Sequence, residues 1–413
     1  MSTPTKCFNV TKMDAVDERL DNFQRWCGSN GIVFPSIELR FCGPEAGFGI
    51  FSKKMLQRDQ IVLQVPKKMM LTAELIAEMD DYSNIFKKFP QKLKPFEVLV
   101  LFFYLEKLKH DSFWLPYLEL LPTKFGTPLN SLPNLNLGQL PSDVRTQIEK
   151  QRQEVDLMKS KLEEMVPQLD EKHLLWSWHI VNSRCIHNEN PWHPLVDCSD
   201  GNNLAVIPLM DMMNHDPEAQ CSPTFDKKCQ QYKIMANKML FPEDQLFVCY
   251  GPHNNANLWI EYGFTIEGNV FNTVKIPFNL ILLLANKVGF KVGEKNESVA
   301  REAAFPCTLY ASDEAISYGL RMTCIIFQMK MNELADWQKI VFNETDDDRR
   351  EQAEQLGIQI VAELAKQFEQ KLKNTEPSLK WIWGDQISVI QTIIGGPSND
   401  RRSPVKIMVQ KHE

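Results

Sequence analysis

The chain has 413 residues, of which 43% are hydrophobic and 10% aromatic, and its formal net charge is -7. A single hydrophobic core tends to stop growing near roughly 250 to 300 residues, so this length predicts two domains. The negative charge argues against direct nucleic acid binding, because proteins that bind phosphates need clustered lysine and arginine.

Ten cysteines are scattered along the chain without a Cys-x-x-Cys pair. The first residues lack a charged start followed by an apolar stretch, so we expect no secretory signal and a cytoplasmic or nuclear location. The cysteines should then be free thiols. The most apolar run, Phe278 to Ala285, is far shorter than the ~20 residues that cross a bilayer. It predicts a buried helix and no membrane contact.

The N-terminal part of the pattern predicts a small β-sheet with a helical insert. Strand patterns at Ile37 to Phe41 and Ile61 to Val65 flank a glycine-containing turn at Cys42 to Gly49. From Thr72 to Arg184 the apolar residues recur at helical intervals. We therefore expect an insert at about residues 75–200.

Strand patterns then return and give way to helices. They occur at Leu204 to Ile207, Gln231 to Met235 and Gln245 to Tyr250. After about Thr273 the chain is mainly helical, with an apolar stripe at four-residue spacing from Leu356 to Leu372 that must be buried.

The predicted fold class is thus α+β. A β-rich domain covers about residues 20–270 and is split by the insert, and an all-helical domain covers 272–413. The segment Gly395 to Arg402 is rich in turn residues and predicts a loop that leads into a short final strand or a loose tail.

Three short motifs carry the functional information. They are Pro-Leu-Met-Asp-Met-Met-Asn-His at 208–215, Cys-Tyr-Gly-Pro-His-Asn-Asn-Ala-Asn at 249–257 and Glu-Tyr-Gly-Phe at 261–264. Together they resemble the cofactor and lysine site of SET-domain protein methyltransferases, in the subgroup of the Rubisco large-subunit lysine methyltransferase. The resemblance implies a SET fold with a threaded pseudoknot, followed by a helical substrate-binding domain. It also implies S-adenosylmethionine as cofactor and a partner protein that presents a lysine, with a histone tail as one candidate.

The resemblance assigns cofactor contacts first to the loop Ala46, Gly47, Phe48 and Gly49. The corresponding loop of the family, Glu-Gly-x-Gly, wraps the cofactor, and glycine permits a close backbone approach because it has no Cβ. Ala46 stands where Glu is common in the family, so the backbone contact is kept and the side chain is not.

Further cofactor contacts fall on Arg184 and on the Asp-x-x-Asn-His motif. Arg184 resembles the arginine of the family's Ser-Arg pair, and a guanidinium can bind a carboxylate with two hydrogen bonds. Asp211, Asn214 and His215 match the motif. The resemblance implies that Asn214 and His215 contact the adenine and the pseudoknot backbone.

Tyr250 is the predicted catalytic residue, and it also belongs to the predicted cofactor site. Tyr262 is predicted to form a second wall of the lysine channel, where aromatic rings hold the aliphatic stem and a hydroxyl orients the nitrogen. Methyl transfer needs a neutral amine, whereas free lysine has a pKa of roughly 10.4. Desolvation beside a sulfonium lowers that pKa, so no metal is needed.

Three alternatives compete with parts of this interpretation. Cys185, His187, His193 and Cys198 could bind zinc, but their spacing is irregular and we expect no metal. The acceptor could be histidine, as in the actin-histidine methyltransferases, although Ile186 replaces the Asn of that group. The protein could also be a non-catalytic binding module.

The segment Trp114-Leu-Pro-Tyr117 also resembles the family, and it indicates the family and not the site.

Overall fold

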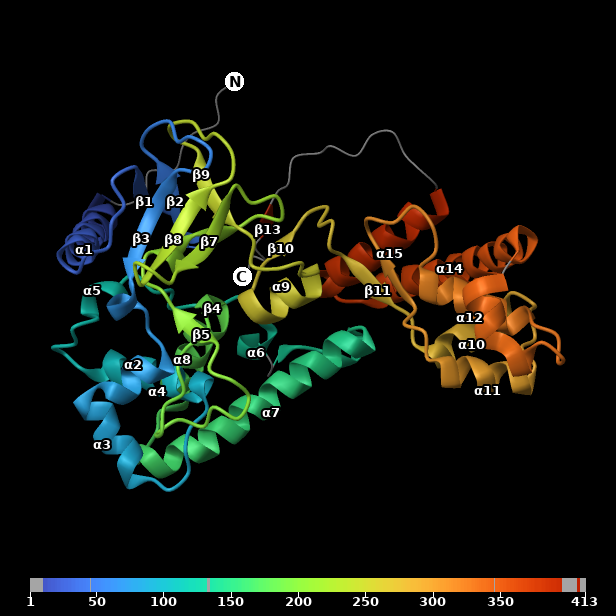
Figure 1. The fold of residues 1–413 in the computed structure, drawn as a ribbon, viewed down its shortest axis with the longest axis horizontal. Helices are drawn as coiled ribbons and strands as arrows, with labels where there is room; N and C mark the ends of the chain where they lie inside the picture. The colour runs from blue at the N-terminus through green and yellow to red at the C-terminus, as the bar shows by residue number, and fades with distance from the viewer. Residues whose placement is uncertain (1–9, 45, 132–133, 345, 396–406, 409–413) are drawn as a thin grey trace. The chain divides into compact units, whose positions relative to one another are not determined.

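The computed structural model describes residues 10–44, 46–131, 134–344, 346–395 and 407–408. The chain divides into two compact units (Figure 1). The first consists of Met1–Asn130 and Glu149–Gly251, and the second of Ser131–Ile148 and Pro252–Glu413. The boundary between the two domains that the sequence predicts near residue 270 stays a prediction.

The first unit contains a four-stranded sheet in the order β1 (Ile37–Gly43), β2 (Gly47–Ser52), β9 (Gln245–Val248) and β6 (Asn214–His215). The β1, β2 and β9 strands pair antiparallel, and β6 lies parallel to β9. This pairing places Gly47 and Gly49, at the start of β2, in the same sheet as the Asn-His dipeptide of β6. The two segments are more than 160 residues apart in the chain.

A second sheet of this unit has the order β3 (Ile61–Pro66), β8 (Gln231–Ala236) and β7 (Cys221–Asp226), and all its pairs are antiparallel. Figure 1 shows it beside β1, β2 and β9. Alternate residues of β8 are buried, as expected for a strand with one face on the core. A third pair, β4 (Cys185–His187) with β5 (Leu204–Val206), follows the helical insert.

Helices fill the chain between β3 and β4, which confirms the helical insert. The longest apolar one, α4 (Pro95–Leu108), is buried on nearly every side and begins with proline, which fits the first turn of a helix. The other helices between β3 and β4 are α2 (Ala73–Glu78), α3 (Asp80–Lys88), α5 (Leu115–Leu118), α6 (Pro128–Ser131), α7 (Ser142–Met165) and α8 (Glu171–Arg184). A separate helix, α1 (Val10–Ser29), precedes the first strand.

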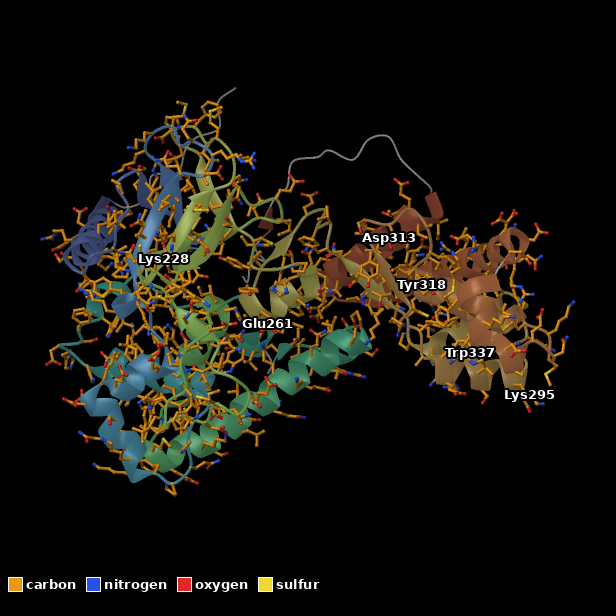
Figure 2. The ribbon with its side chains drawn as sticks, viewed as in Figure 1. Lys228, Glu261, Lys295, Asp313, Tyr318 and Trp337 are labelled. Carbon is orange, nitrogen blue, oxygen red and sulfur yellow. The ribbon has the colours of Figure 1, made fainter. Side chains whose placement is uncertain are left out.

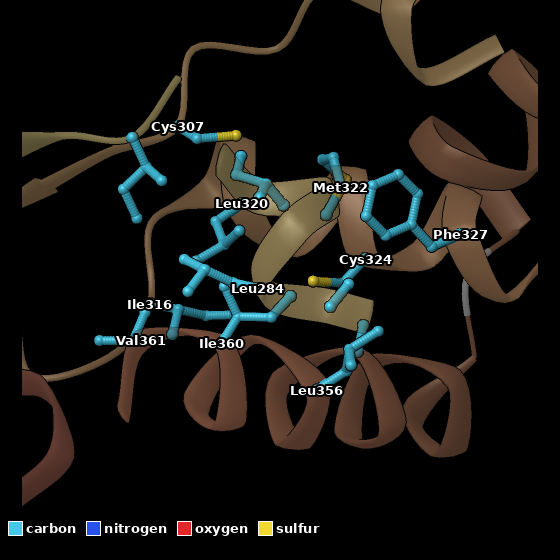
Figure 3. Packing of buried hydrophobic residues seen from close by; sticks show 14 of the residues in the cluster. Leu284, Cys307, Ile316, Leu320, Met322, Cys324, Phe327, Leu356, Ile360 and Val361 are labelled. Carbon is cyan, nitrogen blue, oxygen red and sulfur yellow. The ribbon is translucent and has the colours of Figure 1, made fainter. Parts of the chain in front are cut away.

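The second unit is mainly helical, and one hydrophobic cluster in its core consists mostly of aliphatic side chains (Figure 3). The stripe on α14 (Asp347–Asn374) contributes Leu356, Ile360 and Leu364 to this cluster. Together with it, the unit contains α9 (Asn255–Tyr262), α10 (Phe278–Lys287), α11 (Glu294–Ala303), α12 (Tyr318–Gln328) and α15 (Lys380–Gly395). The burial of the stripe is as the sequence predicts.

Aromatic rings also gather near the surface of this unit. Tyr318 and Trp337, which Figure 2 labels, have ring centroids 6.2 Å from that of Phe305. The Tyr318 side chain is 55% exposed. Phe305 and Trp337 pack against the buried cluster of Figure 3, in which Phe327 is the labelled aromatic residue.

Two details differ from the sequence-based expectation. The C-terminal region is not entirely helical, because β11 (Thr273–Lys275) pairs with β12 (Thr308–Tyr310) and β10 (Thr265–Ile266) with β13 (Ile407–Met408). β11 and β12 are too short to show a strand pattern in the sequence. β13 lies where the short final strand was expected, and the loop predicted before it lies outside the described residues after Gly395. The strand predicted at 245–250 also ends at Val248, so Tyr250 lies just beyond it.

No helix in the described ranges is long and apolar enough to cross a membrane. The apolar run at Phe278 to Ala285 lies in α10, whose buried residues are Ile281, Leu284 and Ala285.

Candidate active site

The Asn-His dipeptide holds the glycine-containing loop of the first unit. The side-chain amide of Asn214, on β6, donates a hydrogen bond to the carbonyl of Phe48 at 3.3 Å. Ala46 is exposed at the turn that precedes β2. Gly47 has a φ of +63°, and a Cβ there would meet no atom within 4 Å. The backbone at Gly47 therefore adopts the left-handed conformation and borders open space, as a loop that contacts a ligand requires.

Gly49 has a different physical role from Gly47. A Cβ on Gly49 would lie 2.5 Å from Nε2 of Gln245, 2.9 Å from Sγ of Cys42 and 3.2 Å from Nδ2 of Asn214. Three polar side chains thus close over this position. Gly49 is needed for side-chain packing that brings Asn214 onto the loop.

Tyr250 is attached to the Asp-x-x-Asn-His segment at three points. Its backbone N–H donates to Nδ1 of His215 at 3.0 Å. Its ring stacks on the imidazole, with centroids 5.1 Å apart and planes at 29°. Its hydroxyl donates to the carbonyl of Met213 at 2.7 Å. Both the backbone and the hydroxyl of Tyr250 are therefore positioned by residues 213–215.

Arg184 and Asp211 form a buried ion pair beside this segment. Nη1 of Arg184, at the end of α8, donates to Oδ2 of Asp211 at 3.0 Å and to the Asp211 carbonyl at 2.9 Å. The hydroxyl of Tyr117, on α5, donates to the same Oδ2 at 2.5 Å. The sequence-predicted cofactor residues Arg184 and Asp211 are thus brought together, and each is the other's direct partner.

Burial and charge act in opposite directions on these groups. Burial raises the pKa of the Asp211 carboxyl, although Arg184 and the hydroxyl of Tyr117 favour its ionised form. Burial disfavours the guanidinium of Arg184, but the carboxylate of Asp211 more than offsets this and raises the pKa of Arg184. Burial, together with the negative Asp211, also raises the pKa of Tyr117 well above its ordinary value. Tyr117 is therefore a hydrogen-bond donor and stays protonated.

Two polar atoms of this ion pair have no partner among the described residues. They are Nε of Arg184 and Oδ1 of Asp211, and both are inaccessible to solvent. A buried polar group without a partner is costly, so a site that leaves two of them is consistent with a polar ligand or ordered water nearby. The donor set, with an open glycine backbone, the amide of Asn214 and a guanidinium, fits a ligand with an amino acid end and an adenine.

Tyr262 ends α9 in the second unit, where its ring lies 5.9 Å from that of His253 and 6.1 Å from that of Phe264. The helix stops there because Gly263 adopts the left-handed conformation with φ 85°. The role of Tyr262 as a wall of the lysine channel stays a prediction.

The alternative zinc residues lie on and after β4, with Cys185 and His187 on the strand itself. Within the described ranges, no three His, Cys, Asp or Glu side chains are grouped so that they could hold a metal ion. Cys185 instead lies near Asp211, and burial raises the pKa of its thiol. The nine cysteines that the structure describes are free.

Tyr117 is the site residue that sequence reasoning missed. Its segment, Trp114 to Tyr117, served only as evidence for the family, because a proline beside aromatic residues ordinarily anchors a helix in a core. Its ring does pack in the core, 6.0 Å from that of Phe23. Only the fold reveals that its hydroxyl reaches Asp211, since the two residues are 94 positions apart.

Part of the chain matches a known protein family. Residues 47–251 match the family model of the SET domain. The structure is also similar to the crystal structure of the SET domain of LSMT bound to lysine and AdoHcy. The TM-score is 0.59, and the sequences are 16% identical. That similarity covers 92% of this chain and 91% of the other. Residues 47–251 therefore match a SET domain, and the chain has the fold of the LSMT domain, as the motifs predicted.

The chain is also similar to individual named proteins. The chain is 25% identical to SET domain-containing protein 4 of Homo sapiens over 325 residues, which cover 75% of this chain and 72% of the relative. It is also 25% identical to the actin-histidine N-methyltransferase of Xenopus tropicalis over 341 residues, 77% of this chain and 55% of that protein. A third relative is the ribosomal lysine N-methyltransferase set11 of Schizosaccharomyces pombe, 24% identical over 257 residues, 61% of this chain and 62% of that protein.

Proposed function

We propose that the protein is an S-adenosylmethionine-dependent protein-lysine N-methyltransferase. The observation that carries the proposal is the contact of Asn214 with the Phe48 carbonyl, because it joins the Asp-x-x-Asn-His segment to the glycine-containing loop. Tyr250 is anchored on the same segment. Residues 213–215 thus hold both the segment expected to bind the cofactor and the hydroxyl of Tyr250.

The comparisons support this choice of chemistry. Structures of the same fold were obtained with AdoMet, and with AdoHcy and lysine. The similar protein of Schizosaccharomyces pombe is named for lysine methylation of a ribosomal protein. Two of the three relatives described above are named for actin and ribosomal substrates, which favours a non-histone protein over a histone tail as the acceptor.

When bound, S-adenosylmethionine supplies a methyl group on a positively charged sulfur. The open backbone at Gly47 and the amide of Asn214 would hold the cofactor. The guanidinium of Arg184 remains charged because Asp211 is beside it, and its Nε would attract a carboxylate. The hydroxyl of Tyr250 would orient the incoming lysine nitrogen, which must arrive without its proton.

Histidine is the second candidate acceptor, because relatives named as actin-histidine N-methyltransferases match 77 to 80% of this chain. Ile186, on β4, is an apolar residue at the position where that group carries Asn. An apolar side chain cannot donate a hydrogen bond to an imidazole. This difference favours lysine.

The test uses the full-length protein, S-adenosylmethionine with a radioactive methyl group, and cell extract as the source of acceptor proteins. Acid hydrolysis of the labelled protein should yield methyllysine. Recovery of methylhistidine would replace lysine by histidine as the acceptor, and no label in any protein would contradict the enzymatic proposal.

A binding measurement separates an enzyme from a non-catalytic module. A ligand that binds only the folded state raises the melting temperature once its concentration exceeds its Kd. We expect such a rise with millimolar S-adenosylmethionine, and a smaller rise for Asn214→Ala. A protein whose melting temperature does not respond to the cofactor would be a binding module.

A further inference from the structure

Tyr117, Asp211 and Arg184 form a buried cluster of hydrogen-bonded polar side chains. Tyr117 and Arg184 come from the helical insert, on α5 and α8, whereas Asp211 lies in the segment that follows β5. The side chain of Asp211 is 1% exposed and receives both donors on one oxygen, Oδ2. The insert therefore holds this segment through the side chain and the carbonyl of Asp211.

The segment that Asp211 belongs to has an unusual backbone. Leu209 has a φ of +71°, a conformation that costs free energy for a residue with a side chain. The turn that follows is closed by hydrogen bonds from the Asp211 N–H to the Ile207 carbonyl and from the Met213 N–H to the Met210 carbonyl. Such a conformation persists only when its surroundings hold it, and Arg184 does so by binding both the carbonyl and the side chain of Asp211.

The carbonyl of Met213, at the end of this turn, accepts the hydroxyl of Tyr250 at 2.7 Å. Any movement of the turn would move that carbonyl, and the hydroxyl of Tyr250 would follow it. The backbone of Tyr250 is held separately, by Nδ1 of His215. The orientation of the Tyr250 hydroxyl thus depends on the Met213 carbonyl, and the position of the Tyr250 backbone depends on His215.

We propose that Tyr117, acting through Asp211 and Arg184, is a positioning residue that sets the direction of the Tyr250 hydroxyl. Its kinetic consequence rests on the proposed methyl transfer, whereas the structural coupling does not. The insert thereby takes part in the reaction without touching the substrate. This role is distinct from the cofactor contact expected of Arg184.

The decisive variant is Tyr117→Phe, which removes the hydroxyl and keeps the ring in the core. The chain offers a matched control, because Tyr82 is also buried and its hydroxyl also donates to a carboxylate, Oε1 of Glu106 at 2.8 Å. Tyr82→Phe should lose a comparable buried hydrogen bond and leave Tyr250 undisturbed. The two variants therefore separate positioning from general stability.

The first measurement needs no activity. The protein is labelled with 3-fluorotyrosine, and the ¹⁹F signal of Tyr250 is identified as the one that Tyr250→Phe removes. The inference expects this signal to shift in Tyr117→Phe and to stay in place in Tyr82→Phe. Arg184→Lys, which loses the planar fork of the guanidinium, should shift it as well and takes the place of Tyr117→Phe if that variant does not fold. An unmoved Tyr250 signal would overturn the inference.

The second measurement is kinetic and uses labelled S-adenosylmethionine with a fixed amount of extract protein. Tyr117→Phe should lower the apparent maximal rate about tenfold and change the apparent KM for the cofactor less than twofold. Added to Tyr250→Phe, it should lower the residual rate less than twofold, since residues that act through one another are not additive. An equal loss in Tyr82→Phe, or a further tenfold loss in the double variant, contradicts the inference. A shifted ¹⁹F signal with no methyl transfer by the wild type would instead sustain the coupling and refute the proposed function.

Discussion

Arg184 and Asp211 form an ion pair that is almost fully withdrawn from solvent, with side chains 16% and 1% exposed and Nη1 3.0 Å from Oδ2. Two charges in such a place stabilise each other but lose their hydration. The pair therefore matters most when one member is removed, because the other charge is then left buried and alone.

Arg184→Met should destabilise the first unit by about 3 to 5 kcal/mol, the usual cost of leaving one buried charge without its partner. The double variant Arg184→Met with Asp211→Leu should regain much of this loss, because neither charge remains. Urea unfolding monitored by tryptophan fluorescence measures both effects. As a control, Lys150→Met removes an exposed charge from a helical pair and should change the midpoint little.

Tyr250→Phe should lower methyl transfer at least tenfold and leave cofactor binding intact. The variant keeps the ring stacked on His215 and the backbone hydrogen bond, but loses the hydroxyl that donates to Met213. Initial rates and the thermal shift with S-adenosylmethionine measure the two properties separately. Turnover equal to that of the wild type would remove Tyr250 from the catalytic role, and Tyr310→Phe, on β12, serves as the control.

Gly319→Ala should unfold or severely weaken the second unit. A Cβ on Gly319, in α12, would lie 2.0 Å from the carbonyl oxygen of Pro306, and a backbone atom cannot move aside as a side chain can. Gly384→Ala is the matched change, since a Cβ at this position of α15 meets nothing within 4 Å. It should raise the stability by about 0.5 to 1 kcal/mol, because alanine favours a helix over glycine.

Thermal unfolding of both variants checks this pair of expectations. A well-folded Gly319→Ala protein with the melting temperature of the wild type would mean that α12 does not pack against Pro306 as described.

Asp385→Asn should stabilise the protein more at pH 7 than at pH 4. Burial raises the pKa of the Asp385 carboxyl from 3.8 to about 6, although the amides of Asn255 and Asn272 oppose the shift. Between pH 4 and pH 7 the folded state binds more protons than the unfolded state. The wild type therefore loses stability as the pH rises. The variant has no such titration and still offers an oxygen to Nδ2 of Asn255, now 2.6 Å from Oδ2.

The difference in stability between Asp385→Asn and the wild type should grow by roughly 2 kcal/mol from pH 4 to pH 6 and level off near pH 7. Melting temperatures at several pH values measure it. A constant difference for Asp385→Asn would contradict the assigned pKa.

Local patterns predicted most of the fold. The helical period of residues 142–165 matches α7, and the stripe from Leu356 to Leu372 lies on α14. These signals are reliable because a long helix repeats its buried face many times. The short strands β11 and β12 were missed because three residues cannot establish a period.

The candidate site was predicted in part. The motifs located the glycine-containing loop and the Asn-His dipeptide, and the tertiary structure brings Asn214 to Phe48. The sequence assigned Arg184 to the cofactor carboxylate or to the wall of the active site, and gave no sign that Asp211 is its direct partner. Nothing in the linear pattern indicates that two predicted ligand contacts neutralise each other.

The sequence by itself determined the family resemblance, the order of strands and helices and the residue types of the candidate site, because these depend on short motifs and local periodicity. Only the tertiary structure decided that Tyr117 of the insert donates to Asp211, that Gly49 is enclosed by three polar side chains and that the Tyr250 hydroxyl meets the Met213 carbonyl. The physical reason is that a hydrogen bond acts over about 3 Å in space, and only the packing of distant segments brings its donor and acceptor within that reach.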